Sequence, residues 1–150
     1  MEIRPYAPSD RAACLGVFDS NAPQFLDPSE RASFEAFLDG IDCAYFVIEH
    51  EGSVAGCGGY AVSEDKSMAS LVWGMVRSDL HRLGLGRFLL LFRLRRISQT
   101  INVPIVRLGT SQHSVAFFEK QGFKAVSVEK DGYAPGIDRV EMVMKLAVCA

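Results

Sequence analysis

The sequence lacks long apolar runs. Its run Phe88–Phe92 is five residues, whereas a helix that spans a membrane needs about 20. The first 20 residues carry charged side chains and no central apolar stretch, so they are typical neither of a secretory signal nor of a transit peptide. We therefore expect a cytoplasmic protein without a membrane segment.

The sequence also lacks closely spaced cysteines. The four cysteines are Cys14, Cys43, Cys57 and Cys149. No two of them form the C-x-x-C pair that is typical of zinc knuckles and redox motifs. We predict mostly buried thiols and no metal site.

The sequence has no excess of basic residues either. The chain has 16 Lys and Arg against 18 Asp and Glu, a net charge of −2, which argues against nucleic acid as the main partner. The charge is unevenly distributed, because residues 1–76 hold four basic and twelve acidic side chains, whereas residues 77–107 hold seven Arg and one Asp. This basic segment suggests a local anionic ligand such as a phosphorylated cofactor, and a solvated Arg-rich helix face is the alternative.

What is present fits one ordinary folded domain over residues 1–150. The composition is 49% hydrophobic and 23% charged, close to the average for globular domains, and no repeat or linker divides the chain. Hydrophobic periodicity and turn residues predict strands over 3–6, 45–49, 54–62, 68–76, 104–109, 126–130 and 140–148. They predict helices over 9–20, 28–39, 84–100 and 112–121. A meander followed by alternating helices and strands indicates a mixed α/β fold.

Glycines interrupt the predicted strand 54–62 at Gly56, Gly58 and Gly59. Glycine in a strand permits close approach of a ligand or a neighbouring backbone, and a simple bulge is the other interpretation.

Residues 76–87 carry the most informative pattern, a strand end that runs through a polar loop into two glycines at a helix start. The first N–H groups of a helix have no internal acceptor, and the helix dipole favours negative charge there. Gly84 and Gly86 lack the Cβ that would keep a pyrophosphate away from the backbone, and Arg82 and Arg87 add positive charge. The loop is neither the dinucleotide fingerprint nor a Walker loop, but it predicts an anion site.

Residues 114–123 read Ser-Val-Ala-Phe-Phe-Glu-Lys-Gln-Gly-Phe. Together with the G-x-G loop, the long helix and the short strand before them, they resemble the GNAT family of acyl-CoA-dependent N-acyltransferases. The family's motifs are R/Q-x-x-G-x-G/A and Tyr-Glu-Lys-x-Gly-Phe, and the resemblance covers essentially the whole chain. It implies a splayed, mostly antiparallel central sheet of six or seven strands with helices on both faces. It also implies that the pantetheine of CoA lies between the strand ending at Val76 and the one ending near Gly109.

The resemblance implies a set of site residues. Those that would hold acetyl-CoA are Met75, Val76, His81, Arg82, Leu83, Gly84, Leu85, Gly86, Arg87 and Ser111. A backbone N–H where the strand bulges near Gly74 and Met75 would polarise the thioester carbonyl, although Gly74 is equally well explained as a packing glycine beside Trp73. The connection between the first two helices would shape the acceptor side, with Asp19, Asn21, Phe25 and Asp27 as substrate-binding residues.

The chain departs from the family pattern at two site positions. His81 replaces the Arg or Gln that opens the loop, and it can still contact phosphate. Phe118 replaces the Tyr that commonly protonates the departing thiolate, so Ser111, Ser114 or an ordered water would have to supply that proton.

The identity of the general base is also left open by the sequence. Ser70 stands where some relatives place a Glu, so a base acting through water is expected. The candidates are Glu49, His50, Glu64 and His113.

The resulting hypothesis is an N-acetyltransferase that moves the acetyl group of acetyl-CoA to a primary amine of a small molecule or peptide, by direct attack in a ternary complex. The alternative, favoured by Phe118 and Ser70, is a catalytically weak CoA-binding module. An RNA-directed acetyltransferase is disfavoured, because no second basic face is apparent. Assembly as a homodimer is left open.

Overall fold

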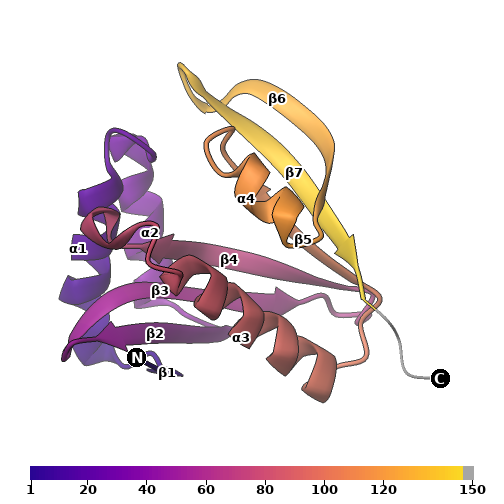
Figure 1. Cartoon of the computed structure of the whole chain (residues 1–150), viewed down its shortest axis with the longest axis horizontal. Coiled ribbons are helices and arrows are strands. Elements are labelled where there is room, and N and C mark those ends of the chain that lie inside the picture. The colour runs from indigo at the N-terminus through magenta and orange to yellow at the C-terminus, as the bar shows by residue number, and fades with distance from the viewer. Residues whose placement is uncertain (147–150) are drawn as a thin grey trace.

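The computed structural model describes residues 1–146, which form a seven-stranded sheet in the order β1-β2-β3-β4-β5-β7-β6 with four α-helices (Figure 1). The strands are β1 (Glu2–Pro5), β2 (Ala44–His50), β3 (Ser53–Val62), β4 (Met68–Val76), β5 (Ile105–Thr110), β6 (Lys124–Ala134) and β7 (Ile137–Lys145). The helices are α1 (Arg11–Asn21), α2 (Arg31–Asp39), α3 (Leu85–Thr100) and α4 (Val115–Lys120). The predicted mixed α/β fold is therefore confirmed.

Strands β2 and β3 form the predicted hairpin. Their two-residue turn has positive φ at both central positions, 52° at Glu51 and 80° at Gly52, as such a turn requires. The turn sets the register of β2 with β3, and in the separate pairing with β4 the glycines of β3 lie opposite the end of β4.

The sheet divides between β4 and β5, its one parallel pair. These strands are paired only where Met68–Ser70 meets Ile105–Arg107, and beyond that point they diverge, so that β1–β4 and β5–β7 form two wings (Figure 1). All other neighbouring strands are antiparallel. This is the splayed sheet that the resemblance implied.

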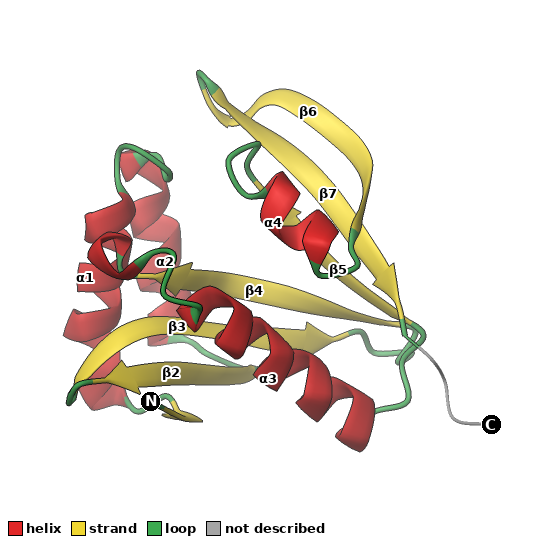
Figure 2. Cartoon of the chain, viewed as in Figure 1, coloured by secondary structure: helices red, strands yellow, loops and turns green. Residues whose placement is uncertain are grey.

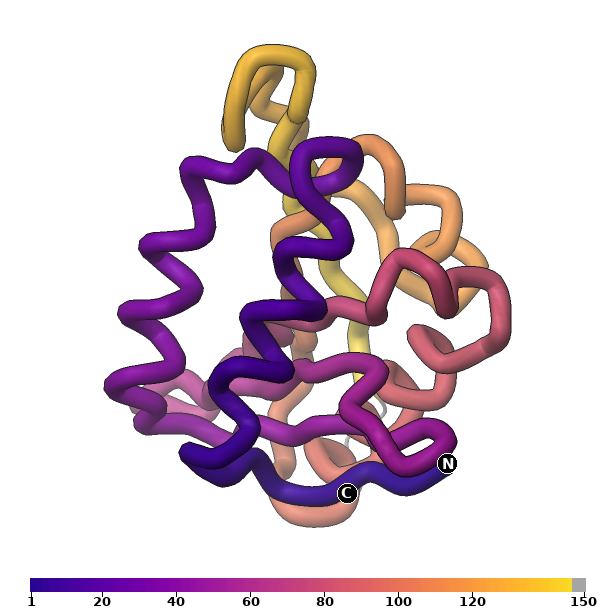
Figure 3. Tube along the Cα trace, turned by 90° about the vertical axis from the view of Figure 1, so that its left-hand side faces the viewer, coloured from indigo at the N-terminus to yellow at the C-terminus, as the bar shows by residue number. Residues whose placement is uncertain are grey.

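The helices cover both faces of the sheet. Helices α1 and α2 lie side by side on one face (Figure 3), where Phe18 and Phe34 join the core formed with β2 and β3. Helix α3 packs along the other face, and its residues Leu90 and Ile97 contribute to a second core. Helix α4 packs against the wing of β5–β7 (Figure 2). Each helix contributes one apolar stripe to a core, as an amphipathic helix does.

Several predicted boundaries were wrong. The helix expected over 112–121 covers only Val115–Lys120, because the side chain of Gln112 donates to the carbonyl of Gly136 and accepts from the N–H of Asp138, which fastens this loop to the β6–β7 hairpin. Strand β6 is longer than the predicted 126–130, and β7 begins before the predicted 140–148. The last two residues of that predicted strand lie outside the described residues.

The thiol prediction is confirmed for Cys14 and Cys57, which are fully buried, whereas Cys43 is half-buried. Cys149 lies outside the described residues. Among residues 1–146, no helix combines the length and the apolar character needed to cross a membrane.

Candidate active site

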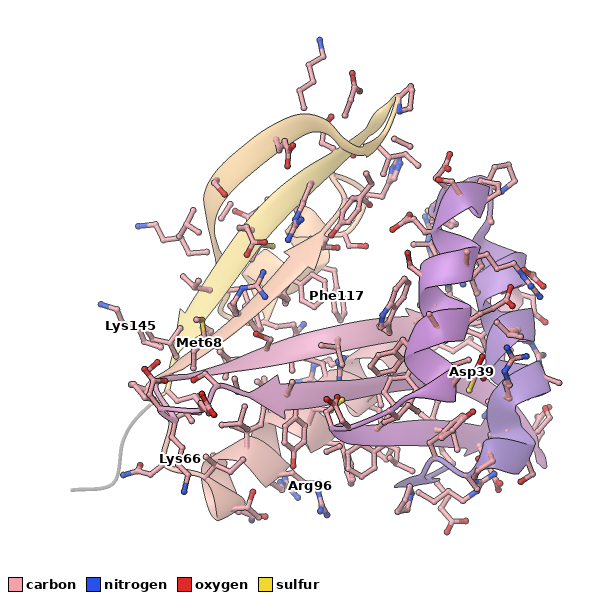
Figure 4. The ribbon with its side chains drawn as sticks, turned by 180° about the vertical axis from the view of Figure 1, so that it is seen from behind. Asp39, Lys66, Met68, Arg96, Phe117 and Lys145 are labelled. Carbon is pink, nitrogen blue, oxygen red and sulfur yellow. The ribbon has the colours of Figure 1, made fainter. Side chains whose placement is uncertain are left out.

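A cavity of about 890 Å³ opens where β4 and β5 diverge. Its walls come from the end of β4, the loop after it, the first half of α3, the end of β5, α4, the α1–α2 connection and the β6–β7 hairpin. Figure 4 shows the ring of Phe117 lying in this opening, between β4 and the wing of β5–β7. The cavity thus lies where the resemblance places the pantetheine.

Strand β4 has a bulge at the wall of the cavity. Met75 pairs with Cys57 and Val72 pairs with Gly59, so Trp73 and Gly74 together face the single residue Gly58. Trp73 has a positive φ of 43°, a conformation that costs free energy in any residue other than glycine. The predicted bulge is therefore present, and it interrupts the regular backbone pairing of β4 beside the cavity.

Gly58 and Gly74 face each other beneath this bulge and leave room for a side chain from α3. A Cβ added to Gly58 would lie 3.2 Å from Cζ of Arg93, and a Cβ added to Gly74 would lie 3.0 Å from its Nη2. A side chain at either position would therefore crowd the Arg93 guanidinium, and one at Gly58 would also crowd Leu89, 3.1 Å away. The interpretation of Gly74 as a packing glycine holds, but its packing partner is Arg93.

Arg93 is a buried cation that none of the sequence motifs indicated. Its side chain lines the cavity, is 4% exposed, and donates from Nη1 to the carbonyl of Gly59 at 3.2 Å. Burial lowers the pKa of Arg93 to about 10. A signal was present in the sequence, because Arg93 stands between Leu89 and Ile97 in the i, i+4 stripe of α3 that is otherwise apolar.

The loop before α3 has the geometry of an anion site. Gly84 precedes the helix with φ of 84°, and none of the backbone N–H groups of residues 82–87 donates to an acceptor within residues 1–146. A Cβ on Gly86 would lie 3.9 Å from both Phe117 and Val76, inside the opening. Six successive free N–H groups beside a helix N-terminus form a cradle that favours a pyrophosphate.

Charge supports the same assignment. Arg82 and Arg87 line the cavity and are exposed, and neither forms an ion pair with another described residue. By contrast, Arg77 of the same basic segment is paired with Asp79 at 2.8 Å. Two cations therefore remain available beside the cradle.

Two predicted cofactor residues do not line the cavity. The side chain of Leu83 is 58% exposed, and that of Leu85 is 1% exposed within a small core beside Ile48. Neither side chain is in the cavity lining, so a part for these two residues in holding the cofactor would rest on their backbone N–H groups.

His81 and Asn21 both line the cavity, and both contact the end of β4. The Nδ2 of Asn21 donates to the carbonyl of Val76 at 2.9 Å, and Nε2 of His81 lies 2.9 Å from the same oxygen. The ring of Phe25 packs against His81 and His113, with centroids 5.3 and 5.8 Å apart. These side chains connect the α1–α2 segment to the cradle.

Ser111, Ser114 and Phe118 line the cavity from the side of α4. The ring of Phe118 packs edge-on against Phe117 and Phe123, with centroids 5.0 and 5.7 Å apart. Phe118 is therefore part of the apolar packing of this wall and has no proton to donate.

The acidic residues predicted on the acceptor side lie elsewhere. Asp19 is paired with Arg31 at 2.8 Å on the surface between α1 and α2, and Asp27 caps the turn before α2 by accepting from the N–H of Ser29. The cavity lining includes neither of them. Asp27 lies in the connection as predicted, whereas Asp19 belongs to the last turn of α1. Capping and ion pairing direct the two carboxylates away from the cavity.

Glu30 and Tyr133 are polar side chains on the side of the cavity formed by the α1–α2 connection and the β6–β7 hairpin, and the sequence motifs did not indicate them. Both line the cavity, and burial raises the pKa of each. The hydroxyl of Tyr133 lies over Gly109, 2.9 Å from where a Cβ would be. In the sequence Glu30 has the spacing of a capping residue relative to Asp27, and its carboxylate does accept from the N–H of Asp27. Because capping already explains this residue, the sequence gives no sign that it also lines the cavity.

Of the four candidate bases, only His113 lines the cavity. Glu49 is paired with Arg4, His50 is the last residue of β2 beside the β2–β3 turn, and Glu64 is exposed in the β3–β4 turn. Ser70 stands where the resemblance places a Glu in some relatives. Its hydroxyl accepts a hydrogen bond from Nη1 of Arg107.

Comparison with known proteins gives one family and many similar structures. The model of the family described as "Acetyltransferase (GNAT) domain" matches residues 16–146. A protein described as a GNAT-family acetyltransferase from Desulfovibrio desulfuricans superposes with a TM-score of 0.81 at 22% identity, covering 97% of this chain and 99% of that one. The ribosomal-protein-S18-alanine N-acetyltransferase from Escherichia coli gives 0.81 at 21% identity, covering 99% and 96%.

An aminoglycoside 6'-N-acetyltransferase complexed with coenzyme A gives a TM-score of 0.79 at 14% identity, covering 100% of this chain and 99% of that one. At such identities these likenesses show the fold alone. No curated protein sequence matches the chain significantly.

Proposed function

The chain belongs to the GNAT family of acetyltransferases, and on that premise we propose that it transfers the acetyl group of acetyl-CoA to a primary amine by direct attack in a ternary complex. The observation that carries the proposal is the cradle of free N–H groups at residues 82–87, which adjoins the bulge of β4 in one cavity. The cradle suits a pyrophosphate, and the bulge suits a polarised carbonyl, so the two features match two parts of acetyl-CoA that must be held, the pyrophosphate and the thioester.

Acetyl-CoA supplies the reactive thioester when it is bound. The N–H groups of residues 82–87, with Arg82 and Arg87, would hold the pyrophosphate, and a backbone N–H at Gly74 or Met75 would donate to the thioester carbonyl. Phe117 and Phe118 give this part of the cavity an apolar wall that excludes water.

The acceptor would enter between the α1–α2 connection and the β6–β7 hairpin. An alkyl amine has a pKa of about 10.4, so the site must both attract the cation and remove its proton before attack. Glu30 suits the first task as the acidic side chain in the lining, and its burial, which raises the pKa of its carboxyl, also suits it to accept the proton. His113 is the second candidate for the base.

The departing thiolate depends less on proton transfer than the attacking amine does. A thiol has a pKa of about 8.5, so it is a tolerable leaving group even without a proton donor. Ser111, Ser114 and Tyr133 line the same cavity as Phe118, the hydroxyl of Tyr133 over Gly109, so three hydroxyl groups can be tested as donors.

The test is a thiol-release assay with acetyl-CoA against polyamines, amino acids, aminoglycosides and peptide N-termini. We expect saturable release of CoA with at least one cationic amine, at a rate that rises with pH as the amine and its base lose their protons. Tight CoA binding without turnover over the whole panel would favour the second candidate, a CoA-binding module, for which Phe118 and Ser70 are the specific observations. The cytoplasmic location and the homodimer remain predictions.

A further inference from the structure

Arg93 carries a charge for which the protein supplies no counter-ion. The side chain is 4% exposed, and within residues 1–146 no carboxylate lies within ion-pair distance of it. Burial of a charge without a partner is costly, and in ordinary cores an apolar residue would occupy such a place. The pKa of Arg93, lowered to about 10 by burial, still leaves it charged at neutral pH.

The hydrogen bonds of the guanidinium leave one nitrogen free. Nε donates to the carbonyl of Leu89 at 3.4 Å and Nη1 to that of Gly59 at 3.2 Å. Nη2 has no acceptor among the described residues, and Arg93 belongs to the cavity lining. The two bonds therefore fix the plane of the guanidinium, while both N–H groups of Nη2 stay available to a ligand.

The free nitrogen lies at the bulge and not at the cradle. A Cβ on Gly74 would lie 3.0 Å from Nη2, so the cation adjoins the residue whose backbone we assign to the thioester carbonyl. Leu89 lies beside Arg93 at Gly58. The same cavity is lined by three residues that belong to one apolar core cluster, Leu71, Leu90 and Leu108. We call the part of the cavity at Arg93 and Gly74 its inner end. An acyl group held at the bulge would therefore meet one cation within an otherwise apolar pocket.

We propose that this inner end is an acyl subsite for a short acyl group that ends in a carboxylate, which accepts a hydrogen bond from Nη2 of Arg93. The proposal rests on the proposed function, because it takes the CoA site as given, and beyond acetyl-CoA it adds a second class of donor, the CoA thioester of a short dicarboxylic acid. In the transfer, the amine nitrogen forms a bond to the thioester carbonyl carbon, the C–S bond breaks with its electron pair on sulfur, and the amine proton goes to the base. The distal carboxylate is unchanged.

The test is calorimetric binding of matched donors without an acceptor, so it does not depend on the unknown amine. The probes are free CoA and three pairs of equal chain length, malonyl- with propionyl-CoA, succinyl- with butyryl-CoA, and glutaryl- with pentanoyl-CoA. We expect the charged member of at least one pair to bind about tenfold more tightly or better, as a charge-assisted hydrogen bond in a dry pocket does. CoA bound with no preference in any pair would overturn this inference alone, whereas no binding of CoA or any thioester would overturn the proposed function as well.

Variants of Arg93 separate ligand binding from support of the bulge. Arg93→Met should abolish the preference and leave the affinity for free CoA within about threefold, and Arg93→Lys should retain part of the preference because the charge remains. Arg95→Met, on the exposed side of the same helix, is the matched control and should keep the preference in full. If Arg93→Met folds, as judged by a cooperative melt, and still prefers the charged donors, the assignment to Arg93 is wrong. If Arg93→Met does not fold, the affinities of the wild-type protein for the paired donors still decide whether a charged acyl group is preferred.

Discussion

The two sides of the cavity are built in different ways. On the side of α3 the polar groups belong mainly to the backbone, in the N–H groups of residues 82–87 and in the bulge of β4. On the opposite side they belong to the side chains of Glu30, His113 and Tyr133, which come from three separate segments. Backbone groups are placed by the path of the chain and depend little on residue identity, whereas side-chain chemistry changes with a single substitution. We therefore expect the first side to carry what is common to the family and the second to carry the acceptor preference of this chain.

The largest expected effect is on the backbone side. Gly84→Val should weaken CoA binding by about 100-fold, because a β-branched residue does not tolerate a φ of 84° and the helix start must shift. Titration calorimetry with CoA measures it. The matched control is Gly52→Val in the β2–β3 turn, which has a similar φ of 80° and equally open surroundings but lies away from the cavity. Equal loss of CoA affinity in both variants would mean that strain, and not the cradle, is responsible.

The next effect is on the side-chain side. Glu30→Gln should lower kcat/KM for the best amine of the screen by about 100-fold, within the range for loss of a general base, and leave CoA affinity unchanged. Because burial raises the pKa of Glu30, the wild-type rate should rise with pH as this carboxyl loses its proton, and the variant should lose that part of the pH profile. Steady-state kinetics over pH checks both points.

Asp19→Asn is the control for Glu30→Gln. Asp19 is paired with Arg31 outside the cavity, so its neutralisation should leave KM for the amine as it is. An equal rise of KM in both variants would show that the acidic N-terminal half acts through its general field, and the distinction between the two sides would be lost.

A smaller effect is expected from charge beside the cradle. Arg87→Gln should weaken CoA binding by about tenfold at low salt and by less at high salt, because an exposed cation is screened. Arg95→Gln, exposed further along α3, removes the same charge away from the cradle. Equal losses from both variants would assign the effect to net charge.

The smallest effect concerns the apolar wall. Phe118→Tyr should raise kcat by a few-fold at most, since a hydroxyl there could protonate the thiolate, and KM for acetyl-CoA should stay similar. A sharp loss of activity in a folded variant would mean that the packing of Phe118 against Phe117 and Phe123 is needed as it stands.

The difference between the two sides also explains what the sequence could predict. The cradle was predictable because the two glycines at 84 and 86 stand close together in the sequence at a helix start, and Gly84 has the positive φ that favours glycine. The bulge was predictable from the resemblance, which places it near Gly74. Glu30 was not, because its spacing from Asp27 already has a local explanation and its exposure to the cavity depends on how the α1–α2 connection packs. Asp19 was misplaced for the converse reason, since its partner Arg31 comes from the next helix.

Arg93 is the intermediate case. Its place in the buried stripe of α3 follows from helical periodicity, but the space for it is created by Gly58 and Gly74 on two other strands. A charge in an apolar stripe is visible in a sequence, whereas the pair of glycines that accommodates it becomes visible only once β3 and β4 are in register.

The most direct measurement is an amide NMR titration that compares CoA with pantetheine. If the backbone of residues 82–87 holds the pyrophosphate, the amide resonances of these residues shift strongly with CoA and little with saturating pantetheine, while those of Gly74 and Met75 respond to both. Shifts at residues 82–87 that are equally large with pantetheine, or absent with bound CoA, would contradict the assignment of the cradle and with it the division of the cavity into a backbone side and a side-chain side.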